Sequence, residues 1–258
     1  MAAVGCLTRW SVSLSRHRLS QCSKNIGVPM ANRRLSSRDL PNMSVAIVGA
    51  GPSGFYTAKY LQHSYEHQDE STCQIDILDR LPTPFGLVRS GVAPDHPEVK
   101  NVQHDFENVM SQNQQTIQYF GNVYVGRHVQ LDELLQLYDA VVLAYGSASD
   151  TKLQVKGADH LIGVLSAREF VAWYNGHPDF VDIGQKVASV LNEDSHVLIV
   201  GQGNVALDCA RILAKGTKGS LYDTDLASHS IPVLGDGVAQ TTIVGRRGHV
   251  QGAFTIKV

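Results

Sequence analysis

Two segments of the chain repeat one order of apolar, glycine and helical positions. Ser44–Val48 and Ser195–Val200 each end in a continuous run of four apolar residues, and each is followed by a glycine-rich turn and a stretch with helical spacing. A continuous apolar run is typical of a parallel strand that is buried on both faces. We therefore predict two strand–turn–helix units, with their helices over Phe55–Gln62 and Leu207–Lys215.

Further patterned stretches extend both units. Strands are predicted beside the first unit at Cys73–Asp79 and Ala140–Ala144, and beside the second unit at Thr241–Val244. Helices are predicted at Asp132–Leu137 and Ala167–Asn175. The stretch Gly216–Gly237 is rich in Gly, Ser, Asp and Pro, so it is predicted to be an insertion loop. The fold class that follows is α/β, with two Rossmann-like dinucleotide-binding domains at residues 41–150 and 151–258.

The amino-terminal segment differs in charge from the rest of the chain. Met1–Arg38 contains seven Lys and Arg residues and many Ser, but no Asp or Glu. This composition predicts a mitochondrial transit peptide at residues 1–40, and a disordered basic tail is the alternative. Taking seven positive charges from the formal net charge of −2 leaves −9 for the remainder. Such an acidic body argues against nucleic acid as a partner.

The cysteines and histidines exclude several kinds of redox and metal site. Cys6 and Cys22 lie in the predicted transit peptide, while Cys73 and Cys209 are far apart and no CxxC occurs. A disulfide scaffold and a cysteine-bound iron–sulfur cluster are therefore excluded for this chain, and redox chemistry has to come from a bound cofactor. His63 and His67 are four residues apart, but we expect this pair to face water, and no zinc site is predicted.

The first glycine turn matches the dinucleotide-binding fingerprint in its structural context. Gly49 permits the tight turn after the strand, Gly51 lets the backbone approach a pyrophosphate, and Gly54 allows the helix to pack closely. The start of the helix offers free N–H groups to phosphate. Asp79 ends the next predicted strand, where a carboxylate accepts hydrogen bonds from ribose hydroxyls. The alternative is a purely structural turn with a surface aspartate.

The second glycine turn differs in its charge pattern. It reads Gly201-x-Gly203-x-x-Ala206, and Arg246 and Arg247 follow the next strand where an NAD site has an acid. Guanidinium groups bind a 2′-phosphate bidentately, so this pattern favours NADP over NAD, and a solvated arginine pair is the alternative. One site with an acid and one with paired arginines predict FAD and NADP as cofactors, and hence hydride transfer between nicotinamide and flavin.

Longer stretches resemble the NADPH–adrenodoxin (ferredoxin) reductase family. The resemblance runs in one order from Val45 to Lys257, through Pro84–Arg89, Gly91–Lys100, Phe170–Gly176, Gly201–Asp208, Gly245–Gly248 and Ala253–Lys257. It implies that the NADP domain is inserted in the FAD domain. The small subunit of glutamate synthase has a similar plan, but it carries a cysteine-rich cluster domain where this chain has its basic segment.

The resemblance implies roles for individual residues. The FAD pyrophosphate would be bound by Gly49, Gly51, Ser53 and Gly54, and the FAD ribose by Asp79. Backbone groups of Leu87 and Val125 would contact the flavin nucleotide. The NADP pyrophosphate would be bound by Gln202, Gly203, Asn204 and Val205, and its 2′-phosphate by Arg246 and Arg247.

The resemblance also implies two catalytic candidates, His96 and Asp208, close to one another and to the flavin or the ferredoxin. A carboxylate beside an imidazole orients the ring. The structural alternative is that His96, which lies between Asp95 and Pro97, only caps its loop.

The activity implied is electron transfer from NADPH through FAD to a mitochondrial [2Fe–2S] ferredoxin (adrenodoxin). That ferredoxin would serve haem-thiolate hydroxylases in steroid synthesis and iron–sulfur assembly. The resemblance further implies a monomer in the mitochondrial matrix, with at most peripheral contact with the inner membrane.

Family members are nearly twice as long as this chain and return to the FAD domain after the NADP domain. We therefore expect both domains to be incomplete at the C-terminus, with an exposed edge on the FAD sheet. The alternative function is that of a truncated, catalytically incompetent isoform or fragment that at most binds nucleotide. A plain interaction module on a Rossmann scaffold is a third class, which two intact fingerprints disfavour.

Overall fold

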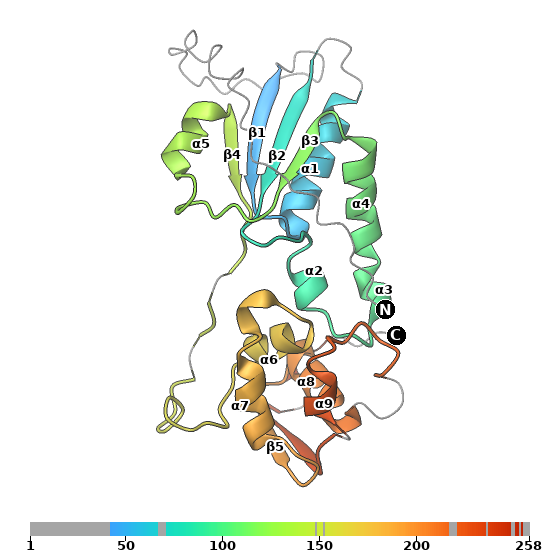
Figure 1. Ribbon diagram of the computed structural model, residues 1–258, viewed down its shortest axis with the longest axis vertical. Coiled ribbons are helices and arrows are strands. Elements are labelled where there is room, and N and C mark those ends of the chain that lie inside the picture. Colours follow the sequence, from blue (N-terminus) through green and yellow to red (C-terminus); the bar gives the residue numbers. More distant parts are fainter. Residues whose placement is uncertain are drawn as a thin grey trace, which may run out of the picture.

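The computed structural model describes two lobes, which an extended segment joins (Figure 1). The described residues are 42–66, 71–147, 149–151, 153–216, 221–235, 237–248, 251–252 and 254. The predicted transit peptide at residues 1–40 lies outside them, as does His67 of the histidine pair. Each lobe contains one parallel sheet, so the predicted α/β fold with two Rossmann-like units is confirmed.

The first lobe is built on a four-stranded parallel sheet. Its strands are β1 (Met43–Val48), β2 (Cys73–Leu78), β3 (Ile117–Phe120) and β4 (Ala140–Leu143), in the spatial order β3-β2-β1-β4. The central strand β1 pairs with β2 from Met43↔Cys73 onward and with β4 from Val45↔Ala140 onward. Its residues Val45–Val48 are all buried, as the continuous apolar run predicts.

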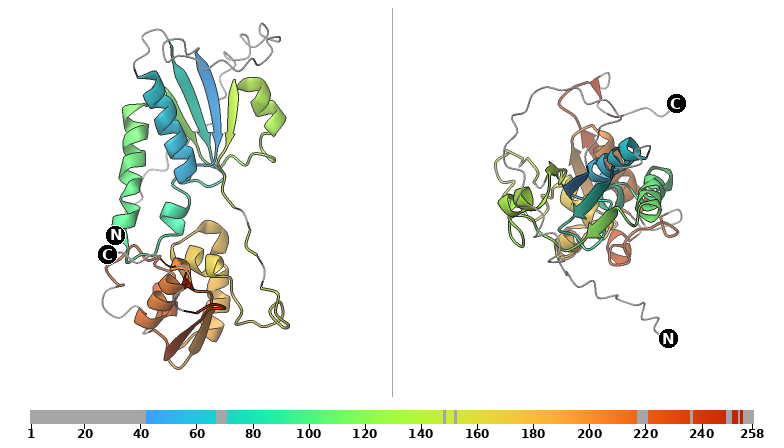
Figure 2. Two further views of the ribbon diagram at one scale, coloured as in Figure 1. Left: turned by 180° about the vertical axis from the view of Figure 1, so that it is seen from behind. Right: turned by 90° about the horizontal axis from the view of Figure 1, so that it is seen from above.

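Helices cover both faces of this sheet. On one face α1 (Pro52–Tyr65) and α4 (Val102–Gln112) pack over the alternate side chains of β1 and β2, and the view from behind in Figure 2 shows both helices across the strands. On the other face α5 (Leu131–Leu137) places Leu134 against Val48 and Leu78. This arrangement leaves the carboxyl ends of the strands directed toward the second lobe (Figure 1).

The second lobe has a smaller sheet with helices on one side. The strands β5 (His196–Val200) and β6 (Gln240–Val244) are parallel, and α6 (Ala167–Tyr174), α7 (Ile183–Val190) and α8 (Asn204–Lys215) build the core beside them. The prediction that the strand after Ser195 is buried on both faces was wrong. Leu198 and Val200 are each 62% exposed, because no described element covers that face of the sheet.

The segment predicted as an insertion loop is in part a core element. It contains the short helix α9 (Ile231–Leu234), and Leu221, Leu226 and Leu234 are buried against α6 and α8. Because the segment is rich in Gly, Ser and Asp, its composition does not predict that these leucines are buried. Several further elements are not predicted by the sequence patterns: α2 (Leu87–Ser90), α3 (Pro97–Lys100), α4, β3, α7 and the 3₁₀ turn η2 (Pro178–Phe180).

Helix α6 has the best side-chain cap of the second lobe. The hydroxyl of Ser166 accepts hydrogen bonds from the backbone N–H groups of Arg168 (3.1 Å) and Glu169 (3.3 Å), and it donates to the carboxylate of Asp150. We expect Ser166→Ala to lower the free energy of unfolding of this lobe by ~1 kcal/mol, the usual loss for an N-cap.

Hydrogen exchange of the α6 amides, followed by mass spectrometry, measures this loss. The control is Ser189→Ala, whose hydroxyl is exposed and only donates to the carbonyl of Lys186 within α7. The capping account is contradicted if both substitutions accelerate the exchange of α6 equally.

Candidate dinucleotide-binding sites

The turn between β1 and α1 requires glycine at its two ends. Gly49 has a φ of +114°, and a Cβ there would lie 2.4 Å from the carbonyl oxygen of Ala144. A Cβ on Gly54 would lie 2.0 Å from the carbonyl oxygen of Gly49. Gly51 differs, because a Cβ on it would meet no protein atom within 4 Å. The turn is therefore closed by the protein at its ends and open above its middle glycine.

Asp79 organises the backbone around this turn. One carboxylate oxygen accepts the N–H of Ala50 (2.7 Å) and the other accepts the N–H of Leu81 (2.9 Å). Its backbone carbonyl accepts the N–H of Val123 (2.9 Å), which draws the loop after β3 to the same place. A carboxylate oxygen accepts more than one hydrogen bond, so both oxygens keep acceptor capacity for a further donor.

A second loop lies against the glycine turn. The N–H of Phe85 donates to the carbonyl of Ala50 (2.7 Å), and Phe85 itself has a φ of +88°. Gly86 (φ +50°) comes so close that a Cβ there would lie 3.1 Å from Cα of Gly51. Leu87 starts α2 just after this contact and is 66% exposed. Three loops thus meet at the carboxyl edge of the first sheet, the usual ligand site of such sheets.

The remaining predicted residues of the first site lie in the same region. Ser53 is exposed in the first turn of α1, and its carbonyl accepts the hydroxyl of Thr57 (2.7 Å). Val125 lies half-buried in the loop after β3 and forms an isolated bridge with Val129.

The turn between β5 and α8 repeats the open geometry. Gly201 has a φ of +135°, and a Cβ on either Gly201 or Gly203 would meet no protein atom within 4 Å. Asn204 and Val205, the first two residues of α8, are exposed. Gln202 crosses to the loop after β6, where its amide donates to the carbonyl of Gly248 (3.3 Å). This hydrogen bond ties the two loops of the second site together.

Arg246 and Arg247 extend from the loop after β6 into solvent. Both side chains are exposed, and within the described residues neither guanidinium has a carboxylate partner. Exposed guanidinium groups of this kind favour contact with anionic groups.

The N-terminal ends of α1 and α8 share two features that favour phosphate binding. Neither helix has a side-chain hydrogen bond at its N-cap, and neither has an acidic residue in its first turn. Neither first turn supplies a carboxylate of its own to compete for the N–H groups, and the open space above Gly51 and Gly203 is the space that a pyrophosphate would fill. The residues present fit two dinucleotides.

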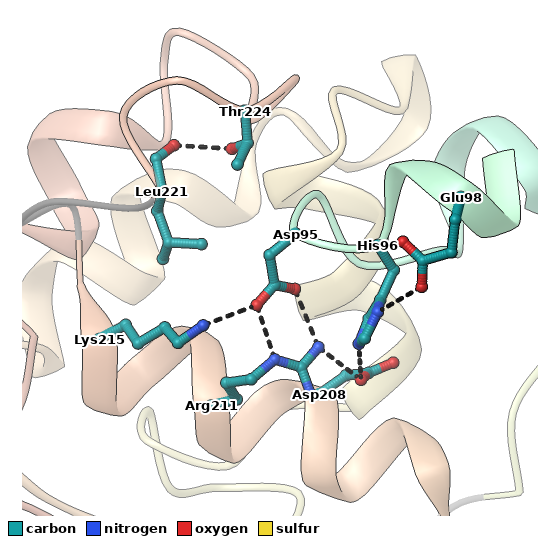
Figure 3. Close-up of polar contacts among 8 residues, drawn as sticks. All are labelled: Asp95, His96, Glu98, Asp208, Arg211, Lys215, Leu221 and Thr224. Atoms are coloured by element: carbon teal, nitrogen blue, oxygen red, sulfur yellow. Dashed lines mark hydrogen bonds and ion pairs between the residues drawn. The ribbon is translucent and has the colours of Figure 1, made fainter. Parts of the chain in front are cut away.

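His96 and Asp208 come together across the two lobes (Figure 3). Nε2 of His96 lies 3.9 Å from Oδ1 of Asp208, and its Nδ1 lies 3.0 Å from Oε1 of Glu98. Asp208 is also bound by Arg211, at 2.8 Å. His96 and Asp208 were predicted from the sequence, whereas Arg211 was not. The i,i+3 spacing of Asp208 and Arg211 on a helix was the signal available.

A family model described as pyridine nucleotide-disulphide oxidoreductase matches residues 43–255. The chain belongs to this family. It is 46% identical over 229 residues to the mitochondrial NADPH:adrenodoxin oxidoreductase of Arabidopsis thaliana, covering 88% of this chain and 45% of that protein. The human protein of the same name is 46% identical over 215 residues, covering 83% of this chain and 40% of its own length.

Solved structures of this family resemble the chain in fold as well. The oxidoreductase FprA of Mycobacterium tuberculosis, also solved in complex with NADPH, superimposes with a TM-score of 0.76 at 42% sequence identity. The match covers 83% of this chain and 46% of FprA. The chain thus spans about half the length of the relatives that it matches.

Metal and membrane sites can be examined directly in the structure. The residues that the structure describes contain no group of three or more His, Cys, Asp or Glu placed to hold a metal ion. His63 is exposed and lies 2.7 Å from a carboxylate oxygen of Glu66. Among the described helices, none combines the length and the apolar character needed to cross a bilayer.

Proposed function

We propose that the chain carries the nucleotide-binding part of an NADPH-dependent ferredoxin reductase of the adrenodoxin reductase type. Electrons would pass from NADPH through FAD to a [2Fe–2S] ferredoxin. The proposal rests on membership of the oxidoreductase family, on relatives named as NADPH:adrenodoxin and NADPH-ferredoxin reductases, and on two open glycine cradles with different charge. The single observation that carries it is the free arginine pair beside the second cradle.

FAD would occupy the cradle of the first lobe. The N–H groups at the start of α1 would bind its pyrophosphate, with Gly49, Gly51, Ser53 and Gly54 shaping the turn. Asp79 would hold the ribose with the acceptor capacity left on its oxygens. The backbone of Leu87 and Val125 would contact the flavin nucleotide from the neighbouring loops.

NADP would occupy the cradle of the second lobe. Its pyrophosphate would lie over Gln202, Gly203, Asn204 and Val205 at the start of α8. Arg246 and Arg247 would bind the 2′-phosphate. When bound, the flavin supplies acceptance of a hydride and release of single electrons, whereas the protein supplies binding and orientation. His96 and Asp208 would act as orienting groups where the two lobes meet.

The cellular setting follows the same relatives. We infer a mitochondrial protein of the matrix with a transit peptide at residues 1–40, because relatives from Arabidopsis, Drosophila and rat are named mitochondrial. The ferredoxin would be adrenodoxin, serving steroid hydroxylases and iron–sulfur assembly. We further propose a monomer with at most peripheral membrane contact. The FAD domain would comprise residues 41–150 and the NADP domain residues 151–258.

Coenzyme preference tests the arginine pair. We expect the chain to bind NADP⁺ more tightly than NAD⁺ in calorimetric titration, and Arg246→Gln together with Arg247→Gln to remove this preference. Each charged hydrogen bond contributes ~1.5–3 kcal/mol, so the loss of one bond from each arginine should lower the affinity ratio by about 100-fold or more.

Gly203→Ala is the matched control for this test. It fills the open space above the cradle without touching the arginines, so it should weaken NADP⁺ and NAD⁺ equally. Equal affinity for the two coenzymes in the unmodified chain would overturn the assignment of the second cradle. An FAD affinity that Gly51→Ala leaves unchanged would overturn the assignment of the first.

A further inference from the structure

We propose that Arg211 is a positioning residue that links the two lobes through Asp95 and holds Asp208 beside His96. The link between the lobes is independent of bound coenzyme, whereas its use in electron transfer rests on the proposed function. Figure 3 shows the arrangement, with one guanidinium between the carboxylates of the two lobes.

Asp95 and Arg211 come from opposite sides of the junction. Asp95 lies in the first lobe, in the loop between α2 and α3, and Arg211 lies on α8 of the second lobe. Nε of Arg211 donates to one oxygen of Asp95 at 2.7 Å, and an Nη donates to the other at 2.9 Å. This bidentate geometry fixes direction as well as distance, so it constrains how one lobe is oriented on the other.

Two cationic side chains bind the carboxylate of Asp95 on this side of the junction. Lys215, one turn further along α8, also donates to it, at 3.1 Å. The side chain of Asp95 is only 11% exposed. Burial alone would raise the pKa of Asp95, but the hydrogen bonds from Arg211 and Lys215 outweigh burial and lower that pKa to about 2. The carboxylate therefore stays charged near neutral pH, so the link does not act as a pH switch there.

Arg211 also reaches the candidate catalytic pair. The same Nη2 of Arg211 that binds Asp95 also donates to Oδ1 of Asp208, at 2.8 Å, and this oxygen lies 3.9 Å from Nε2 of His96. His96 is the residue that follows Asp95. One side chain thus fixes the backbone before His96 and the carboxylate that faces its ring. The planar fork of arginine combines a bidentate grip on Asp95 with a bond to Asp208, whereas the ammonium of a lysine lacks this fixed bidentate geometry.

Other contacts between the lobes do not have this double role. Lys100 pairs with Asp225 (2.5 Å), and Asn175 donates to the carbonyl of Ser90 (3.3 Å). Neither contact touches His96 or Asp208. The pair of Lys100 and Asp225 therefore provides a control that breaks an ionic contact at the same junction while leaving the candidate pair intact.

Interlobe distances in the full chain, without coenzyme, test the link. Nitroxide labels would be attached to cysteines introduced at the exposed positions Lys59 and Glu193, in a variant whose Cys6 and Cys22 are replaced by serine. Pulsed electron–electron double resonance would then measure the distribution of distances between the two labels. Cys73 and Cys209 are buried, and burial raises their pKa values to about 11 and about 12, so they react poorly with the label. We expect Asp95→Asn and Arg211→Gln each to broaden the distribution, and the double variant to be no broader than either.

The ring of His96 gives the second readout. Its carbon-bound proton resonance should shift in Arg211→Gln, shift less in Arg211→Lys, and stay unchanged in Asp225→Asn. Unaltered distances in both Asp95→Asn and Arg211→Gln would overturn the link, and so would equal broadening in Asp225→Asn. An unshifted His96 resonance in Arg211→Gln would overturn the positioning role. None of these measurements uses a coenzyme, so a failed coenzyme titration would count against the proposed function alone.

Discussion

Replacing Gly54 by alanine is expected to abolish the native fold of the first lobe, whereas Gly51→Ala should leave it intact. A Cβ on Gly54 would lie 2.0 Å from the carbonyl oxygen of Gly49, a backbone atom that the turn holds in place. Relief requires α1 to move off β1 and its buried core. We expect the loss to exceed roughly 4 kcal/mol, which is beyond the range of ordinary substitutions.

Gly51→Ala is the matched substitution in the same turn. Gly51 has a φ of −84° and a ψ of −176°, which any residue adopts, and a Cβ there meets no protein atom. The free energy of unfolding should change by less than about 0.5 kcal/mol. The added methyl group instead occupies the proposed place of the FAD pyrophosphate, so FAD affinity should fall about tenfold or more, equivalent to ~1.4 kcal/mol.

Thermal unfolding followed by circular dichroism, together with quenching of flavin fluorescence on binding, separates the two effects. The closed ends and open centre of this turn predict opposite results for the two variants. A folded, flavin-binding Gly54→Ala protein would contradict the role given to Gly54. Undiminished FAD affinity in Gly51→Ala would contradict the role given to Gly51.

Phe55→Ala should destabilise the first lobe by ~3–5 kcal/mol, the usual range for a buried phenylalanine. The ring of Phe55 is fully buried, stacks on Phe106 with centroids 4.9 Å apart, and lies 5.3 Å from Phe85. Its removal leaves a cavity between α1, α4 and the loop that contacts the glycine turn. Hydrogen exchange of the β1 amides reports the opening of this lobe separately from the other.

Tyr60→Ala on the same helix is the control, because its ring is 65% exposed. It should change the free energy of opening, measured from hydrogen exchange of the β1 amides, by less than about 0.5 kcal/mol. Equal effects of the two substitutions would show that this aromatic cluster does not stabilise the lobe. Since Phe85 belongs to the cluster, we also expect Phe55→Ala to loosen the Phe85–Gly86 loop above Gly51.

The sequence predicted those elements whose signals are local. The glycine turns after β1 and β5 were found because tight turns need glycine at fixed spacing. Helix α4 was missed although Val102, Phe106 and Val109 have helical spacing, since polar residues separate them. Strand β3 is only four residues long and contains Gln118, so it lacks a clear apolar run.

The remaining differences arise from tertiary contacts. The apolar run of β5 predicts burial on both faces, but the sequence of a strand alone does not show which elements pack against it. The contact of Asp95 with Arg211 joins residues 116 positions apart, and nothing local to either residue indicates it. By contrast, the free arginines after β6 were predicted, because their place follows from the end of a strand.

The two lobes have separate apolar cores that share no residue, while charged and polar contacts join them. Parting the lobes would therefore uncover groups that water solvates readily, and neither apolar interior would be opened. The two lobes can separate transiently at a smaller free-energy cost than that of unfolding either lobe. The two halves of the molecule can therefore change their relative orientation while each half stays folded.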